Sequence, residues 1–307
     1  MVRATIGPVW TGNEVWLIGG SALLFLAFPK AYAAGFSGFY LALMILLWLL
    51  IGRGLAFELR GHVEHQLWRA GWDAIFSVSG LLLALLLGLL VGNVSRGVPL
   101  NAEGYFFLPL WTDSRPGVHP GMLDWFTLLS GLTMVLLLGL HGATYLAMKT
   151  IGPLREKSRS VVGTVSALAA VSLSALYVAW PFVQPAVREN YVTNPAGCVW
   201  PATSVAALVL VLLFHVRHRQ VAAFVSSCLL IASFLITLAW GTYPNLLMAI
   251  DPANSVTIAG AAAERGALQV ALWWALPGLT LVMCYQWLIR RLFAGPVASA
   301  SHHSHGA

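Results

Sequence analysis

The sequence has 307 residues, of which 59% are hydrophobic and only 9% are charged, and its mean hydropathy is +0.79. A chain of this composition cannot cover a water-facing surface with polar side chains, so we expect lipid to surround most of it. The formal net charge of +6 comes from basic residues scattered between apolar runs, without a basic stripe or interleaved aromatic residues, which argues against a nucleic-acid partner.

Eight apolar runs are long enough to cross a bilayer core, which is roughly 30 Å thick and needs about 20 residues per helix. Because backbone hydrogen bonds must close within each segment in lipid, every run should be an α-helix. The sequence therefore predicts an all-α fold, a polytopic transmembrane helical bundle of about eight helices, with residues 1–307 forming a single integral membrane domain. The predicted spans are residues 14–33, 37–57, 72–94, 123–148, 160–183, 199–215, 220–247 and 267–293.

A faint internal repeat accompanies these spans. The first predicted helix closes on Ala-Phe-Pro at residues 27–29, the seventh closes on Thr-Tyr-Pro at residues 242–244, and another span follows each. This pattern favours two similar helical bundles. Beyond the last span, residues 299–307 combine small residues with histidines, and we expect a disordered tail there, with a metal site as the alternative.

The basic residues are distributed unequally between the two membrane faces. If the N-terminus is cytoplasmic, twelve of the seventeen lysines and arginines fall inside and five fall outside. This bias obeys the positive-inside rule, so we expect both termini to be cytoplasmic. The inside group is Arg3, Arg53, Arg60, Arg69, Lys149, Arg155, Lys157, Arg159, Arg217, Arg219, Arg290 and Arg291, and the outside group is Lys30, Arg96, Arg115, Arg188 and Arg265.

Two of the predicted helices begin with an acid beside a tryptophan. Asp73 follows Trp72 and Asp124 precedes Trp125, so both acids are predicted to cap a helix N-terminus near the membrane interface. The longest loop, residues 95–122, connects these two helices and is predicted to cover the external face.

Histidines are scarce in the predicted spans. Only His141 and His215 fall within or at the end of a span, and His215 begins a basic cluster typical of an interfacial segment. Gly139 and Gly142 flank His141 and leave room for a flat ring, which makes His141 a candidate haem contact; the alternative is a histidine hydrogen-bonded within the bundle. One histidine supplies at most one axial ligand, so we predict neither a haem–copper core nor another metal site.

Two acids near the predicted cytoplasmic face are candidates for moving protons, because proton transfer through hydrocarbon needs ionisable groups. Glu14 opens the first predicted helix directly after a Gly-Asn pair, and its alternative role is that of a first-turn acid that favours the helix N-terminus. Glu58 closes the second predicted helix between Arg53 and Arg60, and its alternative role is a solvated boundary charge paired with arginine.

Several segments are shared with a known family. The most specific is Gly-Asn-Glu-Val-Trp at residues 12–16, within Ile-Gly-Pro-Val-Trp-Thr-Gly-Asn-Glu-Val-Trp-Leu at residues 6–17. The others are Ala-Phe-Pro at 27–29, Phe-Ser-Gly-Phe-Tyr at 36–40, Arg-Gly-Leu-Ala-Phe-Glu-Leu-Arg at 53–60, Gly-Asn at 92–93, Gly-Val-Pro at 97–99, His-Gly-Ala-Thr-Tyr-Leu at 141–146 and Lys-Thr at 149–150. In these segments, which are densest before residue 60, the chain resembles subunit II of cytochrome bd quinol oxidase.

The resemblance implies a heterodimer with a haem-bearing subunit I, which holds haem b and haem d, oxidises quinol and reduces oxygen to water. Subunit II of that family holds no haem, so we expect this chain to have no catalytic residue and no directly bound cofactor. Its implied work, in the bacterial cytoplasmic membrane, is to pack against subunit I, shield the haems and help line routes for protons and oxygen. A small accessory subunit is an additional candidate partner.

The resemblance also implies roles for individual residues in the matching segments. The tryptophan of the most specific segment corresponds to a family residue at an oxygen path. The candidates are Trp16 for the oxygen path; Thr11, Glu14 and Glu58 for the proton route; and Asn13, Arg53 and Arg60 for contacts with lipid or quinone at the cytoplasmic face.

Two features depart from the family pattern. The family often has an acid where this chain has Thr11, and a hydroxyl can hydrogen-bond to a water chain but cannot hold the proton itself. The family also has an additional first helix that ends in a Gly-Phe-Asp type motif, and nothing precedes Met1 here. We therefore expect either a short form or a start placed too far downstream.

A membrane transporter or channel is the alternative function, since eight helices and an internal repeat also permit it. Such a protein would need paired intramembrane charges or broken helices near the midplane, and the sequence offers no convincing pair. A purely structural assembly subunit is a third interpretation, which differs in whether Trp16 and the acids matter to turnover.

Overall fold

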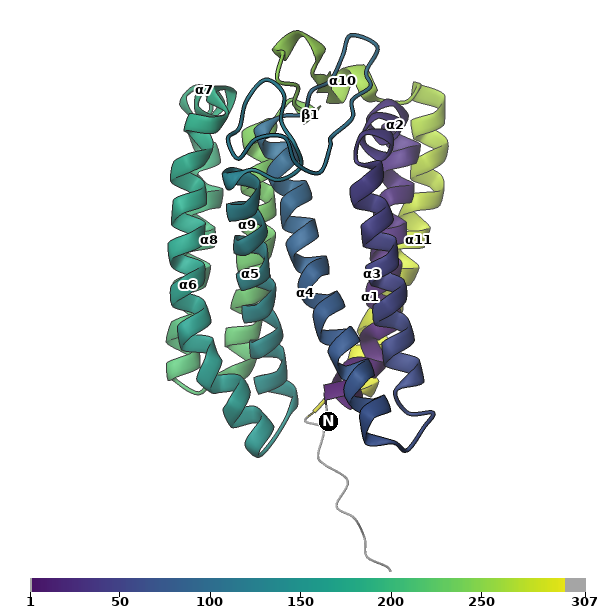
Figure 1. Cartoon of the computed structure of the whole chain (residues 1–307), viewed down its shortest axis with the longest axis vertical. Helices are drawn as coiled ribbons and strands as arrows, with labels where there is room; N and C mark the ends of the chain where they lie inside the picture. The colour runs from purple at the N-terminus through teal and green to yellow at the C-terminus, as the bar shows by residue number, and fades with distance from the viewer. Residues whose placement is uncertain (1, 296–307) are drawn as a thin grey trace, which may run out of the picture.

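The computed structural model describes residues 2–295, except the side chain of Thr11, and the predicted tail of residues 299–307 lies outside this range. Long helices run side by side through most of it (Figure 1). The predicted all-α helical bundle is therefore confirmed. The long helices are α1 (Val2–Ala27), α3 (Tyr40–Leu59), α4 (Gln66–Arg96), α5 (Trp125–Lys149), α6 (Pro153–Val183), α8 (Val199–Val216), α9 (Gln220–Thr242) and α11 (Arg265–Leu292).

The shorter elements gather at one end of the bundle, at the top of Figure 1, together with the loop of residues 97–124. We name this the capped end, and the opposite end, where α1 begins, the N-terminal end. The two short strands pair antiparallel with each other. The short elements are α2 (Pro29–Gly38), α7 (Pro185–Thr193), η1 (Pro195–Cys198), β1 (Asn245–Leu247), η2 (Pro252–Asn254), β2 (Val256–Thr257) and α10 (Ile258–Ala261).

Seven helices within residues 2–295 are long and apolar enough to cross a membrane, namely α3, α4, α5, α6, α8, α9 and α11. The remaining long helix, α1, has 26 residues, and its polar residues Asn13 and Glu14 lower its apolar character. It nevertheless contacts α11 and belongs to the same bundle (Figure 1). The eight predicted spans thus correspond to seven apolar helices and one long helix that carries polar side chains.

The boundaries of the first predicted spans need correction. The first helix begins at Val2 instead of residue 14 and ends at Ala27, and a separate helix, α2, starts at Pro29. A helix in lipid continues through polar residues because its backbone groups have no other hydrogen-bond partner. Pro29 begins a new helix because a proline, which lacks an N–H group, is tolerated in a first turn.

Asp73 does not cap a helix, contrary to the prediction. Helix α4 begins at Gln66, so Asp73 lies inside it, and its side chain pairs with Arg60 at the end of α3. The guanidinium donates Nε to Oδ1 at 2.5 Å and Nη2 to Oδ2 at 2.9 Å. This hydrogen bonding raises the pKa of Arg60 above its usual value. The pair is largely exposed and ties α3 to α4 at the N-terminal end.

The long helices form two groups, which lie on either side of α4 in Figure 1. One buried core, which includes Phe126 and Phe234, lies among α5, α6, α8 and α9. The other, which includes Leu86 and Leu108, lies among α2, α3, α4 and the capped end. The existence of two groups agrees with the expected two-bundle arrangement, while an internal repeat between them stays a prediction.

Small residues join α4 to α5 and so connect the two groups. A Cβ on Gly88 would lie 2.7 Å from the Cα of Gly131, and a Cβ on Gly92 would lie 3.0 Å from the Cα of Thr127. Ser130 Oγ donates a hydrogen bond to the backbone oxygen of Gly88 at 2.8 Å. Close backbone approach through glycine and serine is the usual way for helices to associate in lipid.

A buried ion pair connects the end of α4 to the start of α5. Arg96 and Asp124 are 5% and 1% exposed, and their side chains are in contact. Arg96 Nη2 also donates to Asn93 Oδ1 at 2.6 Å. Asp124 accepts from the backbone N–H groups of Phe126 and Thr127, both at 2.9 Å. The predicted helix cap at Asp124 is confirmed, whereas Arg96 lies inside the protein and not in the predicted external loop.

The backbone next to Arg96 ties further segments of the capped end together. Gln184 Nε2, just after α6, donates to the backbone oxygen of Arg96 at 2.8 Å. The backbone N–H of Val98 donates to Met248 O at 2.9 Å, and Val98 O accepts from the N–H of Ile250 at 3.0 Å. The end of α4 is therefore the point at which α5, α6 and the strand segment meet.

The two ends of the described chain lie together at the N-terminal end. Tyr145 OH donates to the backbone oxygen of Thr5 at 3.0 Å, and Lys149 Nζ donates to that of Phe293 at 2.7 Å. The long helices alternate in direction, so the twelve basic residues of the predicted inside group lie toward this end and the other five toward the capped end. The N-terminal end of the bundle therefore carries more basic residues than the capped end.

We expect Arg96→Gln to destabilise the protein by about 3–5 kcal/mol, because it leaves the carboxylate of Asp124 buried without a charge partner. Asp124→Asn keeps a capping oxygen but removes the negative charge, so it should act similarly. The double variant should recover much of the loss, since two neutral amides can still hydrogen-bond. Thermal unfolding of the detergent-purified protein measures the effect.

The exposed pair of Arg60 with Asp73 provides the control, because Arg60→Gln should change the free energy of unfolding by no more than about 1 kcal/mol. A double variant at positions 96 and 124 that loses as much stability as the two single variants combined would contradict the assignment of a coupled buried pair.

Candidate functional site

Glu14 is a half-buried residue in the interior of α1, about three turns after the helix begins. Its Oε1 atom is enclosed, and no residue in the described part of the chain gives it a hydrogen bond. The alternative role of a first-turn acid is wrong, because only the first turn of a helix has free N–H groups. A buried carboxylate oxygen without a protein partner calls for water or a proton.

Arg53 on α3 lies near Glu14 but beyond ion-pair distance, and their opposite charges attract each other. Its guanidinium lies 4.5 Å from the ring centroid of Trp10 and 5.4 Å from that of Phe76. Trp10 in turn stacks on Phe57, with centroids 4.9 Å apart. Cation–π contacts of this kind strengthen when water is excluded, so they hold the guanidinium between α1, α3 and α4.

A cavity of about 280 Å³ adjoins these residues. Arg53 is the one charged residue in its lining, and Leu17, one turn after Glu14, contributes from α1. Since a water molecule occupies about 30 Å³ in the liquid, the cavity has room for several beside the charged groups. The other lining residues are Leu46, Leu50, Gly80, Leu83, Ala84, Leu87 and Leu138.

The other predicted polar candidates are placed differently. Glu58 is exposed in the last turn of α3, and Arg60, one of the two arginines that flank it in the sequence, pairs with Asp73. Asn13 is exposed on α1, and position 11 lies one turn before Glu14. Of the candidates whose side chains are described, Glu14 and Arg53 are the two that the structure brings together.

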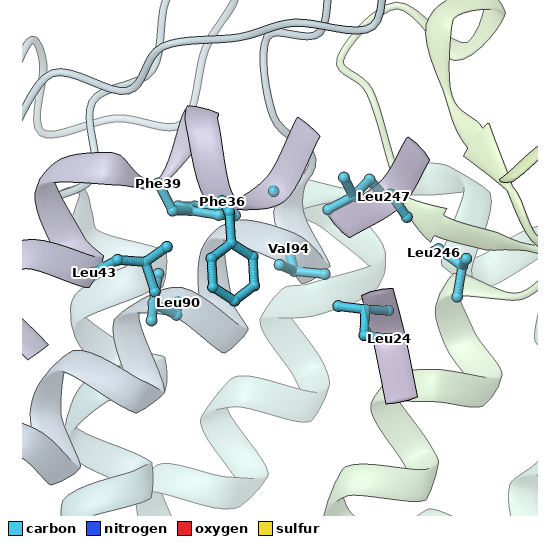
Figure 2. Close-up of a pocket in the computed structure, with 10 residues that line it drawn as sticks. Leu24, Phe36, Phe39, Leu43, Leu90, Val94, Leu246 and Leu247 are labelled. Atoms are coloured by element: carbon cyan, nitrogen blue, oxygen red, sulfur yellow. The ribbon is translucent and has the colours of Figure 1, made fainter. Parts of the chain in front are cut away.

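Trp16 and an apolar cavity both lie along α1. Trp16 is 39% exposed. A second cavity, of about 260 Å³, lies toward the capped end and is lined by apolar side chains and glycine alone. In Figure 2, Leu24 of α1, Phe36 of α2 and Leu90 of α4 surround it. Leu24 lies about 12 Å farther along α1 than Trp16. A lining without polar partners admits small apolar molecules more readily than water.

His141 is hydrogen-bonded within the bundle. Its Nδ1 lies 2.9 Å from Ser227 Oγ on α9, and its ring stacks on Phe224 with centroids 4.9 Å apart. Thr144 Oγ1 lies 3.2 Å from the same serine oxygen. This is the arrangement expected of a histidine hydrogen-bonded within the bundle, while the haem contact at His141 stays a prediction.

These features define a polytopic membrane protein with two half-buried ionisable side chains, Glu14 and Arg53, near the contact of α1, α3 and α4. Within residues 2–295, no group of three or more His, Cys, Asp and Glu side chains is arranged to hold a metal ion. Glu14, Arg53 and both cavities lie on the side of the bundle that contains α1, α3 and α4.

Comparison with known proteins identifies the family. A family model for cytochrome bd terminal oxidase subunit II matches residues 1–293. The chain is 30% identical over 317 residues to cytochrome bd-I ubiquinol oxidase subunit 2 of Escherichia coli K12, covering 94% of this chain and 82% of that one. It is 34% identical over 174 residues to cytochrome bd ubiquinol oxidase subunit 2 of Bacillus subtilis, covering 56% of this chain and 48% of that one. The bd oxidase from Geobacillus thermodenitrificans shares the fold, with a TM-score of 0.73 at 19% identity over 95% of this chain and 85% of that one.

The chain belongs to the cytochrome bd terminal oxidase subunit II family. The resemblance recognised from residues 12–16 and the neighbouring segments is confirmed. The alternative of a transporter or channel is not supported. The protein is accordingly a multi-pass bacterial membrane protein.

Proposed function

We propose that this chain is the non-haem subunit II of a cytochrome bd-type quinol oxidase and that it packs against a haem-bearing subunit I. Subunit I holds haem b and haem d, oxidises quinol and reduces oxygen to water, so no catalytic residue is assigned to this chain. The family match over residues 1–293 carries the proposal. The scarcity of histidines in the long helices supports placing the haems in the partner. A small accessory subunit is a further proposed partner.

The N-terminal end is proposed to face the cytoplasm, with the bundle in the bacterial cytoplasmic membrane. Twelve of the seventeen lysines and arginines lie toward this end, as the positive-inside rule requires of a cytoplasmic face. Asn13, Arg53 and Arg60 are proposed to contact lipid headgroups or quinone from this side. The exposure of Asn13 and the partial exposure of Arg60 support that role.

Glu14 is the proposed proton carrier of this subunit. Positions 11 and 14 lie one turn apart on the same side of α1, so the carboxylate of Glu14 stands close to where the family often has an acid. In this proposal it takes a proton from water on the cytoplasmic side and releases it toward subunit I. Thr11 and the exposed Glu58 are proposed as further members of the route.

Trp16 and the apolar cavity are proposed to form part of the path by which oxygen enters. The exposed ring of Trp16 offers an entrance from lipid, and the cavity about 12 Å farther along α1 offers an apolar resting place. Dioxygen is small and has no hydrogen-bond requirement, so a lining of Leu, Val, Phe, Ala and Gly favours it over ions and water.

The test of the whole proposal is co-purification. A tagged chain isolated from native membranes should bring down one haem-bearing subunit, with haem b and haem d visible in the reduced-minus-oxidised spectrum. His141→Gln should leave that spectrum unchanged, because glutamine can still hydrogen-bond to Ser227. Recovery of the chain without a haem-bearing partner would sink the proposal, and a changed haem spectrum in the His141 variant would refute the separation of His141 from the haems.

We expect Glu14→Gln to slow quinol oxidation on the order of 10²-fold at unchanged haem content, because an amide cannot accept and release the proton. Glu64→Gln is the matched control, since Glu64 is exposed in the turn between α3 and α4 at the same end. Turnover with its pH dependence is the measurement. Unchanged values in the Glu14 variant would remove this residue from the proton route.

Leu24→Phe should raise the KM for oxygen several-fold while leaving turnover at saturating oxygen unchanged, because the larger ring fills the apolar cavity. Leu26→Phe is the control, since Leu26 is 45% exposed on the same helix. Oxygen uptake at low oxygen concentration separates the two variants. Equal KM values in both would show that oxygen does not use this cavity.

A further inference from the structure

Helix α11 has one buried residue, and that residue is polar. Gln286 is 7% exposed, while every other described residue of α11 is half-buried or exposed. Its Nε2 atom is enclosed, and no described residue accepts a hydrogen bond from it. Burying an amide without a partner is costly, so its position requires a reason beyond filling space.

Gln286 lies against Gly12 of α1. A Cβ on Gly12 would stand 2.6 Å from Gln286 Nε2 and 3.4 Å from its Cδ, so any side chain at position 12 displaces the amide. Tyr145 reaches the same side of α1 one heptad earlier, where its hydroxyl donates to Thr5 O at 3.0 Å. Two contacts, from α11 and from α5, therefore act on this face of α1.

The opposite face of α1 carries the candidate site. Trp10 and Glu14, one turn apart, both interact with Arg53, and Leu17 lines the cavity beside it. With 3.6 residues per turn, positions 12 and 14 point about 200° apart around the helix axis. A rotation of α1 that relieves or tightens the contact at Gly12 therefore turns Glu14 by the same angle.

We infer that Gln286 is a positioning residue that sets the rotation of α1 and thereby aims the carboxylate of Glu14 at Arg53 and the adjoining cavity. The functional part of this inference rests on the proposed role of Glu14 in proton transfer. The contact requires both the missing Cβ of Gly12 and the length of the glutamine. Gln286 itself does not touch the proton.

The first experiment changes the size of the contact in the assembled oxidase complex. Gly12→Ala should slow turnover about tenfold or more, within the loss that a misplacement of about 1 Å can cause. The control is Gly19→Ala, which adds the same methyl one heptad along α1, where nothing lies within 4 Å. Gln286→Ala should slow turnover by a similar factor, because it removes the side chain that positions α1, and combining it with Gly12→Ala should add less than about twofold, since both changes act on one contact.

Equal turnover in the Gly12 and Gly19 variants would overturn the inference, as would unchanged turnover in Gln286→Ala. General damage to the complex is separated by repeating Gly12→Ala in a Glu14→Gln background. In that background Gly12→Ala should lower turnover by less than about a further twofold, since the carboxylate that the contact positions is already absent. Full additivity of the two losses would also overturn the inference.

A second readout does not depend on proton transfer. Glu14→Cys with Arg53→Cys, after Cys198, Cys228 and Cys284 are each changed to Ser, allows a thiol-directed cross-linker to report whether the two positions face each other. Gly12→Ala should lower the cross-linking yield several-fold and Gly19→Ala should not, and equal yields would overturn the inference. If Glu14→Gln leaves turnover unchanged, the proton role fails, while the cross-linking yield still decides the positioning role.

Discussion

In the hydrocarbon core of a membrane no solvent is available to a polar group, so each one must find its partner inside the protein. The long helices meet this requirement for the backbone, and the buried pair of Arg96 with Asp124 meets it for two charges at the meeting point of α4, α5 and α6. Oε1 of Glu14 and Nε2 of Gln286 are enclosed polar atoms without a described protein partner. Both atoms lie where α1 packs against a neighbouring helix, and the candidate functional site lies in the same region.

The two halves of the bundle have different physical characters. The helices α5, α6, α8 and α9 enclose a continuous apolar core, while α11 buries only Gln286. Both cavities and the Glu14–Arg53 pair lie on the less enclosed side, among α1, α3 and α4. In the proposed role as subunit II, one half provides a rigid support and the other leaves faces for lipid and a second subunit.

Several site residues show why a local pattern was insufficient. An acid beside a tryptophan predicts a helix cap, and this holds for Asp124 but fails for Asp73, because α4 begins a full turn and more before Asp73 and offers it no free N–H group. Glu14 follows a Gly-Asn pair that reads as a helix start, yet α1 runs through it. Arg96 was expected in an external loop because its neighbours in the sequence do not indicate that it pairs with a carboxylate from the next long helix.

The sequence by itself determined the all-α membrane fold, the charge difference between the two ends and the family, because hydropathy, charge and a short motif are properties of the order of residues. Glu14 and Arg53 could be singled out as ionisable residues, but only the tertiary structure decided that α1 and α3 bring them together. The same holds for Gln286 and Gly12, which are more than 270 positions apart in the chain. In lipid the hydrophobic pattern says that a helix crosses the membrane, while its rotation depends on contacts with helices from distant parts of the sequence.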